Sequence, residues 1–249
     1  MIPGFHAVRE SLLKAENRVR EIWIEEGKRG SRVDEVLRLA KSRGVLALFK
    51  KRGDIEGLVP GTTHQGIVAL TVEFTYTDME ELLQPSPDEQ GFRVILAADH
   101  ITDEGNLGAL IRTAAFFGVR GLVLPKDRSA QVTGRLLKRT SGAYLHLPVA
   151  QVVNLGRALD RLKGRGFWIV GAAGEAPVSI YEFDWNRDTV LILGSESKGL
   201  SRVARDRCDE VVRIPGKGTV ESLNVSVAGG IILAEVERQR LKGKSRGPL

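Results

Sequence analysis

The stretch VILAADHITDEGNLGALIRTAAFFGVRGLVL, residues 94–124, carries the pattern that decides the fold. Its first apolar run, 94–98, has the length of a buried strand, and a second such run follows at 121–124. Between them, residues 107–117 have the length and apolar spacing of a helix. A strand, a helix and a strand in this order predict a β-α-β unit whose two strands pair in parallel.

The same alternation continues toward the end of the chain. We predict further helices at 133–141, 155–163 and 225–241, and further strands at 144–148, 168–172, 190–193 and 210–214. Strands that alternate with helices predict an α/β domain with a mostly parallel sheet covered on both faces.

The first part of the chain has a second, smaller α/β pattern, with helices at 6–15 and 32–42 and strands at 21–24, 45–49 and 67–72. It is followed by an acidic, Pro-containing interval that includes a short helix at 78–83. We therefore predict a small domain at 1–73, a linker at 74–91, a larger domain at 92–241 and a basic tail at 242–249.

The composition narrows the class of protein. Of 249 residues, 42% are hydrophobic, which is enough to fill two cores, and the net charge is +6. Basic segments flank the acidic linker and would attract a phosphate-bearing partner, with a merely solvated basic face as the alternative. The apolar runs are too short to span a membrane and no leader opens the chain, so we expect a cytoplasmic protein without a membrane partner.

The single cysteine, Cys208, excludes an internal disulfide, and we interpret it as a buried, unreactive thiol. The four histidines lack a second ligand at metal spacing, so we expect no metal site. His64 is better interpreted as a hydrogen-bonding residue of a loop or a strand edge.

Three familiar signatures fail on spacing. The run at 194–199 is not a Gly-x-Ser-x-Gly nucleophile elbow, and the Gly-Lys pair at 216–217 lacks the first glycine of a P-loop. The glycines at 171 and 174 lack the rest of a dinucleotide fingerprint. A hydrolase, an NTPase and a dehydrogenase therefore have no support.

Three other blocks place polar side chains at predicted strand ends, where open α/β sheets bind ligands. They are Asn106-x-Gly-x-x-x-Arg112, Leu193-Gly-Ser-Glu-x-x-Gly-Leu-Ser201, and Ile214-Pro215 with Ser222-Leu-Asn-Val-Ser226. Each has a structural alternative. Asn106 could cap its helix, Arg112 could be a surface residue and Glu196 a solvated turn residue, and either Ser222 or Asn224 could cap the last helix.

In order and spacing, the three blocks resemble the SpoU, or TrmH, branch of the SPOUT RNA methyltransferases over nearly all of residues 92–241. This resemblance implies methyl transfer from S-adenosylmethionine to a ribose 2′-hydroxyl of RNA, without a metal. It also implies a deep trefoil knot in the larger domain and a homodimer.

Four shorter segments, at 4–8, 64–67, 125–130 and 171–175, are similar to members that methylate a guanosine in the peptidyl-transferase region of 23S ribosomal RNA. The N-terminal domain of those members is similar to ribosomal protein L30e, an RNA binder. Methylation of a transfer RNA ribose, or a non-catalytic role in RNA binding or ribosome assembly, are the alternatives.

The resemblance also implies the site. The implied catalytic residues are Asn106, Arg112, Glu196, Ser222 and Asn224. The implied cofactor-binding residues are Gly194, Ser195, Gly199, Ile214 and Leu223. Because a guanidinium stays protonated in proteins, we expect Arg112 to bind the adjacent phosphate and stabilise the developing alkoxide, while Glu196 or the phosphate takes the proton.

Overall fold

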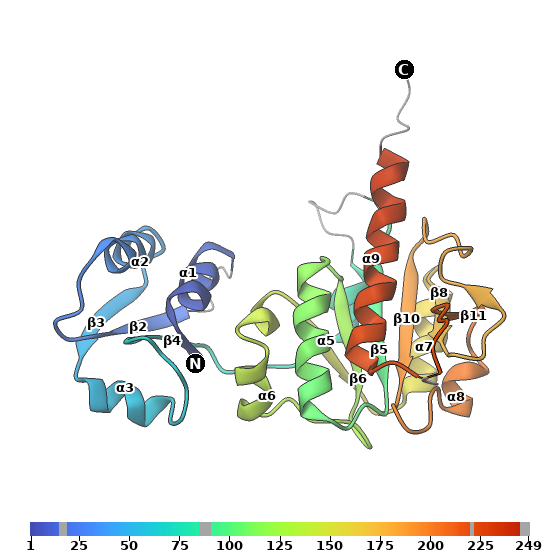
Figure 1. Cartoon of the computed structure of the whole chain (residues 1–249), viewed down its shortest axis with the longest axis horizontal. Coiled ribbons are helices and arrows are strands. Elements are labelled where there is room, and N and C mark those ends of the chain that lie inside the picture. Colours follow the sequence, from blue (N-terminus) through green and yellow to red (C-terminus); the bar gives the residue numbers. More distant parts are fainter. Residues whose placement is uncertain (15–18, 85–90, 220–221, 245–249) are drawn as a thin grey trace. The chain divides into compact units, whose positions relative to one another are not determined.

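The computed structural model describes residues 1–14, 19–84, 91–219 and 222–244. The chain forms two compact units, of which the first comprises Met1–Thr75 and Thr140–His146 (Figure 1). The second comprises Tyr76–Arg139 and Leu147–Leu249. The short segment at 140–146, which the sequence assigns to the larger domain, thus groups with the first unit, and the predicted linker from Tyr76 onward groups with the second.

The first unit is a four-stranded sheet with helices on both faces. Its elements are β1 (Ile2–Pro3), α1 (Phe5–Lys14), β2 (Val19–Glu25), α2 (Ser31–Ser42), β3 (Leu46–Lys50), α3 (Arg52–Leu58), β4 (Ile67–Thr71) and the 3₁₀ turn η1 (Ala143–Leu145). The strand order is β1-β4-β2-β3, in which β2 and β3 are parallel and β4 is antiparallel to both of its neighbours. Trp23 and Val68 pack against α3, so this small helix has its own apolar support.

The second unit contains a seven-stranded sheet in the order β7-β6-β5-β10-β8-β11-β9, and every neighbouring pair is parallel. Its strands are β5 (Val94–Asp99), β6 (Gly121–Pro125), β7 (Val149–Val152), β8 (Trp168–Ala172), β9 (Val178–Ser179), β10 (Thr189–Gly194) and β11 (Glu210–Arg213). Its helices are α4 (Met79–Leu83), α5 (Glu104–Phe116), α6 (Gly134–Arg139), α7 (Leu155–Gly164), α8 (Arg202–Arg205) and α9 (Val225–Lys244). The parallel α/β sheet predicted from the sequence is confirmed.

Alternate residues of β10 face the two helical layers of this unit. Ile192 belongs to an apolar cluster with Leu159 of α7. On the other face α5 and α9 lie side by side (Figure 1), and a Cβ added to Gly229 of α9 would lie 2.8 Å from both Leu193 and Leu110. Gly229 therefore lets α9 approach β10 and α5 closely, and both faces of the sheet are covered as predicted.

The predicted strand at 144–148 is wrong. Ser141 and Gly142 have φ angles of +52° and +89°, which turn the chain into η1, and the strand begins only at Val149. Tyr144 is buried, and its hydroxyl lies 3.0 Å from Oγ1 of Thr71. The left-handed backbone at Ser141 and Gly142, which starts the 3₁₀ turn, explains why this segment does not form a strand.

The structure adds four short elements that the sequence analysis missed: β1, α3, β9 and α8. The helix predicted at 133–141 is shorter, at Gly134–Arg139. The predicted basic tail begins inside α9, and its residues 245–249 lie outside the described part of the chain, as do Ala15 of the first predicted helix and residues 85–90 of the predicted linker. No described helix is long and apolar enough to cross a membrane.

Candidate active site

Three side chains from distant parts of the second unit meet in one hydrogen-bonded cluster. Asn106 lies in the first turn of α5, Glu196 follows the end of β10, and Asn224 directly precedes α9. Asn106 donates from Nδ2 to Oε1 of Glu196, and its Oδ1 accepts a 2.8 Å hydrogen bond from Nδ2 of Asn224. The structure thus brings together one residue from each of the three sequence blocks.

The direction of these hydrogen bonds is determined along the whole cluster. An ionised carboxylate only accepts, so Asn106 must present its NH₂ group to Glu196 and its oxygen to Asn224. The Oδ1 of Asn224 in turn accepts from the backbone N–H of Ser226 at 2.9 Å and from its hydroxyl at 2.7 Å. Because Glu196 and Asn224 are exposed and Asn106 is only partly buried, the cluster is an oriented polar surface that a ligand can reach.

The helix caps decide between the structural and the functional interpretations of these residues. Oδ1 of Asp103 accepts from the backbone N–H of Asn106 at 2.7 Å, so Asp103 caps α5 and the interpretation of Asn106 as the cap is wrong. Asn224 caps α9 through its bond to Ser226, which leaves Ser222 without that role. Asn224 combines the cap with a place in the cluster.

A tight turn carries Glu196. Ser195 and Gly199 exchange two backbone hydrogen bonds of 3.1 and 2.7 Å, and Gly199 has a φ of +62°. A Cβ on Gly194 would lie 2.3 Å from the carbonyl carbon of Gly199, so the turn can close only when residue 194 is a glycine. Oγ of Ser195 accepts from the backbone N–H of Lys198 at 3.3 Å. Glu196 therefore stands at the exposed tip of a closed backbone loop.

A buried carboxylate fastens this loop to the neighbouring strand. Asp99 ends β5 in register with Gly194 and has no exposed surface. Its Oδ2 accepts from the backbone N–H of Ser201 at 2.6 Å, and its Oδ1 lies 2.6 Å from Nδ1 of His100, whose φ is +61°. Asp99 is not among the predicted site residues, although an acid at the end of a wholly apolar strand is a visible signal.

The other residues implied by the resemblance make no hydrogen bond to the cluster in the described part of the chain. Arg112 is exposed on α5, nearly two turns after Asn106, and forms no ion pair with a described residue. Ser222 and Leu223 are exposed just before Asn224, and Ile214 is partly buried at the end of β11. Residues 220 and 221, between these segments, lie outside the described part.

A further arginine, absent from the sequence prediction, lies over the first turns of α5. A Cβ on Gly108 would lie 3.1 Å from Cβ of Arg139, and a Cβ on Gly105 would lie 3.4 Å from its Nη1. The glycines at the start of α5 therefore let the exposed Arg139 of α6 approach the helix that carries Asn106. This adds positive charge to the same part of the unit as Arg112.

The remaining chemistry-bearing side chains belong elsewhere. Among the described residues, no group of three His, Cys, Asp or Glu side chains is placed to hold a metal ion. Burial raises the pKa of the partly buried Cys208 thiol to about 11, so the thiol stays protonated at neutral pH. His64 accepts from the backbone N–H of Gly66 at 3.0 Å, which confirms its predicted role as a hydrogen-bonding loop residue.

The comparison with family models covers both units. Residues 93–234 match the model of the SpoU rRNA Methylase family. The chain belongs to that family. Residues 1–77 match a second model, described as RNA 2′-O ribose methyltransferase substrate binding. The resemblance that the three blocks indicate is confirmed, and all but the last two residues of the second match lie in the first unit.

Individual relatives agree with this assignment. The 23S rRNA (guanosine-2′-O-)-methyltransferase RlmB of Pseudomonas aeruginosa is 40% identical over 240 residues, which span 95% of this chain and 95% of the relative. The SpoU methyltransferase AviRb from Streptomyces viridochromogenes, solved in complex with AdoMet, is 25% identical and has a TM-score of 0.76 over 97% of this chain and 90% of its own. The A. aeolicus TrmH/SpoU tRNA modifying enzyme is 32% identical with a TM-score of 0.56, and covers 69% of this chain and 86% of its own.

Proposed function

We propose that this chain methylates the 2′-hydroxyl of a guanosine in the peptidyl-transferase region of 23S ribosomal RNA. As a member of the SpoU family it is an RNA 2′-O-methyltransferase that uses S-adenosylmethionine. The observation that carries the proposal is the meeting of Asn106, Glu196 and Asn224 in one exposed cluster of this family's fold.

The residues that we assign to the cofactor have the chemistry that it needs. The glycine-closed turn at 194–199 offers backbone groups, and Ile214 and the exposed Leu223 have apolar side chains for a flat ring. We assign cofactor contacts to Gly194, Ser195 and Gly199 as well as to these two residues. When bound, S-adenosylmethionine supplies the methyl group on a sulfonium centre.

The chain's own residues would then position the ribose and remove its proton. Arg112, free of described ion pairs, would bind the phosphate beside the reacting ribose and stabilise the developing alkoxide. Glu196 holds Asn106 through Oε1, whereas its Oε2 accepts from no described residue and is the atom we assign to take the 2′-hydroxyl proton. Ser222 and Asn224 would orient the hydroxyl and the cofactor.

The length of the match favours ribosomal RNA over transfer RNA. The relative named for 23S rRNA aligns with 95% of this chain, whereas the tRNA-modifying structure covers 69% of it. The match of the first unit to the substrate-binding model also disfavours a target that the second unit could recognise by itself. We expect the chain to act in the cytoplasm, where ribosomal RNA is made in bacteria.

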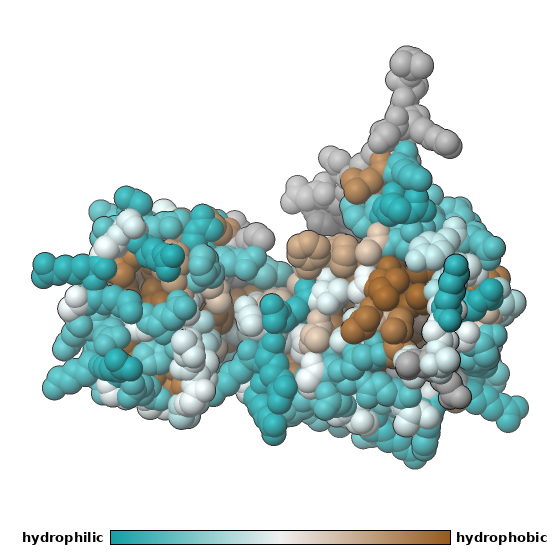
Figure 2. Space-filling view, in the orientation of Figure 1, coloured by the Kyte–Doolittle hydropathy of each residue, from teal (hydrophilic) through white to brown (hydrophobic). Residues whose placement is uncertain are grey.

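We further propose that the chain works as a homodimer through the α5–α9 face of the second unit. Figure 2 shows hydrophobic surface over α9, where Val227 is 49% exposed, and Phe116 at the end of α5 is 83% exposed. Light scattering should give twice the chain mass for the wild type and a monomer for Phe116→Glu. A wild-type monomer with full activity would refute the dimer.

Cofactor binding and methyl transfer test the proposed function. Calorimetry should show binding of S-adenosylmethionine, and tritium from its methyl group should appear in a 23S transcript but not in transfer RNA. Methyl transfer to transfer RNA alone would instead indicate a methyltransferase that acts on a transfer RNA ribose. Absence of cofactor binding would favour a non-catalytic RNA-binding protein.

A further inference from the structure

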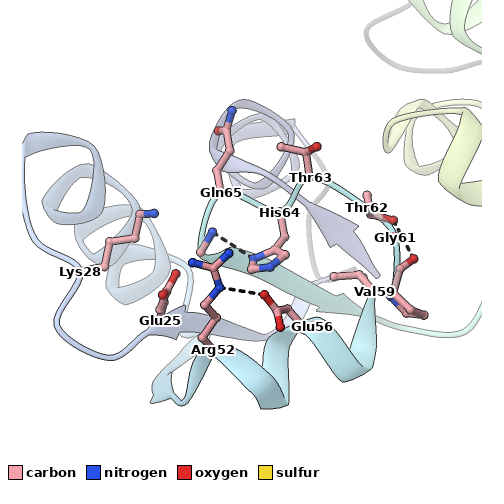
Figure 3. Close-up of a pocket in the computed structure, with 12 residues that line it drawn as sticks. Glu25, Lys28, Arg52, Glu56, Val59, Gly61, Thr62, Thr63, His64 and Gln65 are labelled. Carbon is pink, nitrogen blue, oxygen red and sulfur yellow. Dashed lines mark hydrogen bonds and ion pairs between the residues drawn. The ribbon is translucent and has the colours of Figure 1, made fainter.

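The first unit contains a cavity of about 720 Å³ lined by the end of β2, the helix α3 and the loop 59–66 (Figure 3). Its size lies within the range of small-molecule sites, roughly 300–1,000 Å³. All of its lining residues fall within residues 1–77, the segment that matches the substrate-binding model. The cavity is therefore separate from the cluster of the second unit and belongs to the part of the chain that binds RNA in this family.

A buried histidine presents a free donor to this cavity. His64 is 8% exposed, and its Nδ1 accepts from the backbone N–H of Gly66 at 3.0 Å. A neutral imidazole with Nδ1 as acceptor carries its proton on Nε2, and no described residue accepts that proton. Figure 3 shows the ring turned toward Arg52 and Glu56. A ligand that offers an acceptor would satisfy this donor.

The charged side chains of the cavity are balanced. Nε of Arg52 donates to Oε1 of Glu56 at 2.7 Å, which leaves the other guanidinium donors and the other carboxylate oxygen available. A Cβ on Gly66 would lie 2.5 Å from Oε2 of Glu25 and 2.7 Å from Nζ of Lys28, so both charged ends reach the same point of the wall. The hydrogen bond from Arg52 holds the pKa of Glu56 below its usual value.

This balance disfavours an isolated phosphate and favours a nucleobase. Two carboxylates beside two cations cancel the positive field that a phosphate needs. A base edge carries donors and acceptors side by side, which matches carboxylates next to a guanidinium and an ammonium. The buried side chain of Val59 and the neighbouring Pro60 supply apolar wall for the flat ring.

We propose that this cavity binds one unpaired guanine base of the RNA substrate, with carboxylates of Glu25 and Glu56 accepting from its N1–H and N2–H₂ groups. A carboxylate can accept from both of those neighbouring donors, whereas adenine offers a single amino group on that edge. In this arrangement the donors of Lys28, Arg52 and Nε2 of His64, which line the same cavity, would serve the O6 and N7 acceptors of the base. This inference rests on the proposed function, since it takes RNA as the substrate.

The test compares synthetic RNAs that differ at one base, using the full chain. Fluorescence anisotropy measures binding of a labelled uridine 12-mer, the same 12-mer with one central guanosine, and the same with inosine, which lacks the N2 amino group. The guanosine should strengthen binding about tenfold, the low end of a well-placed base contact, and inosine should lose most of that gain.

Two carboxylate variants separate base recognition from phosphate attraction. Glu25→Gln and Glu56→Gln should abolish the guanosine preference and weaken binding of the guanosine 12-mer by about tenfold. Asp34→Asn, an exposed carboxylate of α2 outside the cavity, is the charge-matched control and should behave as wild type. Tighter binding by the two cavity variants would show that the site lies over phosphates and would overturn the proposal.

Two further measurements make the remaining outcomes decisive. If free guanosine 5′-monophosphate binds more tightly than the guanosine 12-mer, the cavity serves a free nucleotide and the proposal is overturned. Calorimetry with S-adenosylmethionine on the same samples tests the proposed function separately. A wild type that binds the cofactor and methylates RNA, yet binds all three 12-mers equally, would refute only the inference about the cavity.

Discussion

At the scale of single residues, the candidate site depends on the side-chain amide of Asn106, whose nitrogen donates a hydrogen bond and whose oxygen accepts one. Asn106 donates to Glu196 through Nδ2 and accepts from Asn224 through Oδ1, and a carboxylate in its place could not donate. The sequence predicted these residues as one site only through the family resemblance. The spacing of residues could not predict the contact, because 90 residues separate Asn106 from Glu196.

Asn106→Asp places a carboxylate against Glu196 and should lower methyl transfer by about 100-fold, since a lost hydrogen bond to a charged group and a new repulsion act together. Single-turnover transfer of a tritiated methyl group measures this. Asn154→Asp is the matched control, because Asn154 caps α7 and an aspartate caps equally well. Equal losses in both variants would mean that the effect is not specific to the cluster.

Arg112→Lys should lower kcat by about 100-fold while S-adenosylmethionine still binds, because a planar guanidinium can contact phosphate and alkoxide together. Arg157→Lys, at an exposed position of α7, should leave turnover unchanged. Near-normal turnover in Arg112→Lys would refute a multidentate role for this side chain.

At the scale of elements, α9 positions the site by packing its first half against the sheet and tying its second half to a loop. Strand and helix periodicity predicted most long elements, whereas β1, β9 and α8 have only two to four residues, too few for a period to be visible. The helix α3 was missed because Gly53 and Gly57 interrupt its pattern. The segment around the buried Tyr144 was predicted as a strand from its apolar residues, but burial alone does not distinguish a strand from a turn.

Two neighbouring glycines of α9 give opposite predictions. Gly229→Ala should destabilise the fold by about 1–2 kcal/mol, because the new methyl meets the buried Leu110 and Leu193 at 2.8 Å. Gly230→Ala, whose Cβ would lie 3.5 Å from Thr113, should stabilise by up to about 1 kcal/mol through helix propensity. Urea unfolding compares them, and equal free energies would contradict the close approach at Gly229.

The second half of α9 makes stability depend on pH. Hydrogen bonds from Arg238, each 2.6 Å long, lower the pKa of the buried Glu235 below its usual value. Nε2 of Gln239 also donates to Glu235 and to the backbone oxygen of Phe183. Its Oε1 accepts from the backbone N–H of Trp185.

Because the pKa of Glu235 is lower in the folded chain than in the unfolded chain, its carboxylate stabilises the fold when the pH is above the unfolded-state pKa. This stabilisation is lost as the pH falls through the folded-state pKa. The melting temperature should therefore fall on acidification below about pH 4.5. In Glu235→Gln this fall should be shallower, and an unchanged acid limb would contradict the role of Glu235.

At the scale of the whole molecule, the sequence predicted the parallel sheet and the division into a small and a large domain. It did not predict the strand order, in which β10 lies between β5 and β8, because local patterns do not say which strands pair. Nor did it predict the cavity of the first unit, whose walls come from β2, α3 and a loop that are apart in the sequence. The trefoil knot and the dimer remain predictions from the family resemblance.

The most direct test of the proposed function maps 2′-O-methyl groups in 23S ribosomal RNA from cells with and without this chain. We predict that one guanosine of the peptidyl-transferase region loses its ribose methyl group without the chain and regains it with the wild type but not with Asn106→Asp. An identical methylation map with and without the chain would contradict the proposed function.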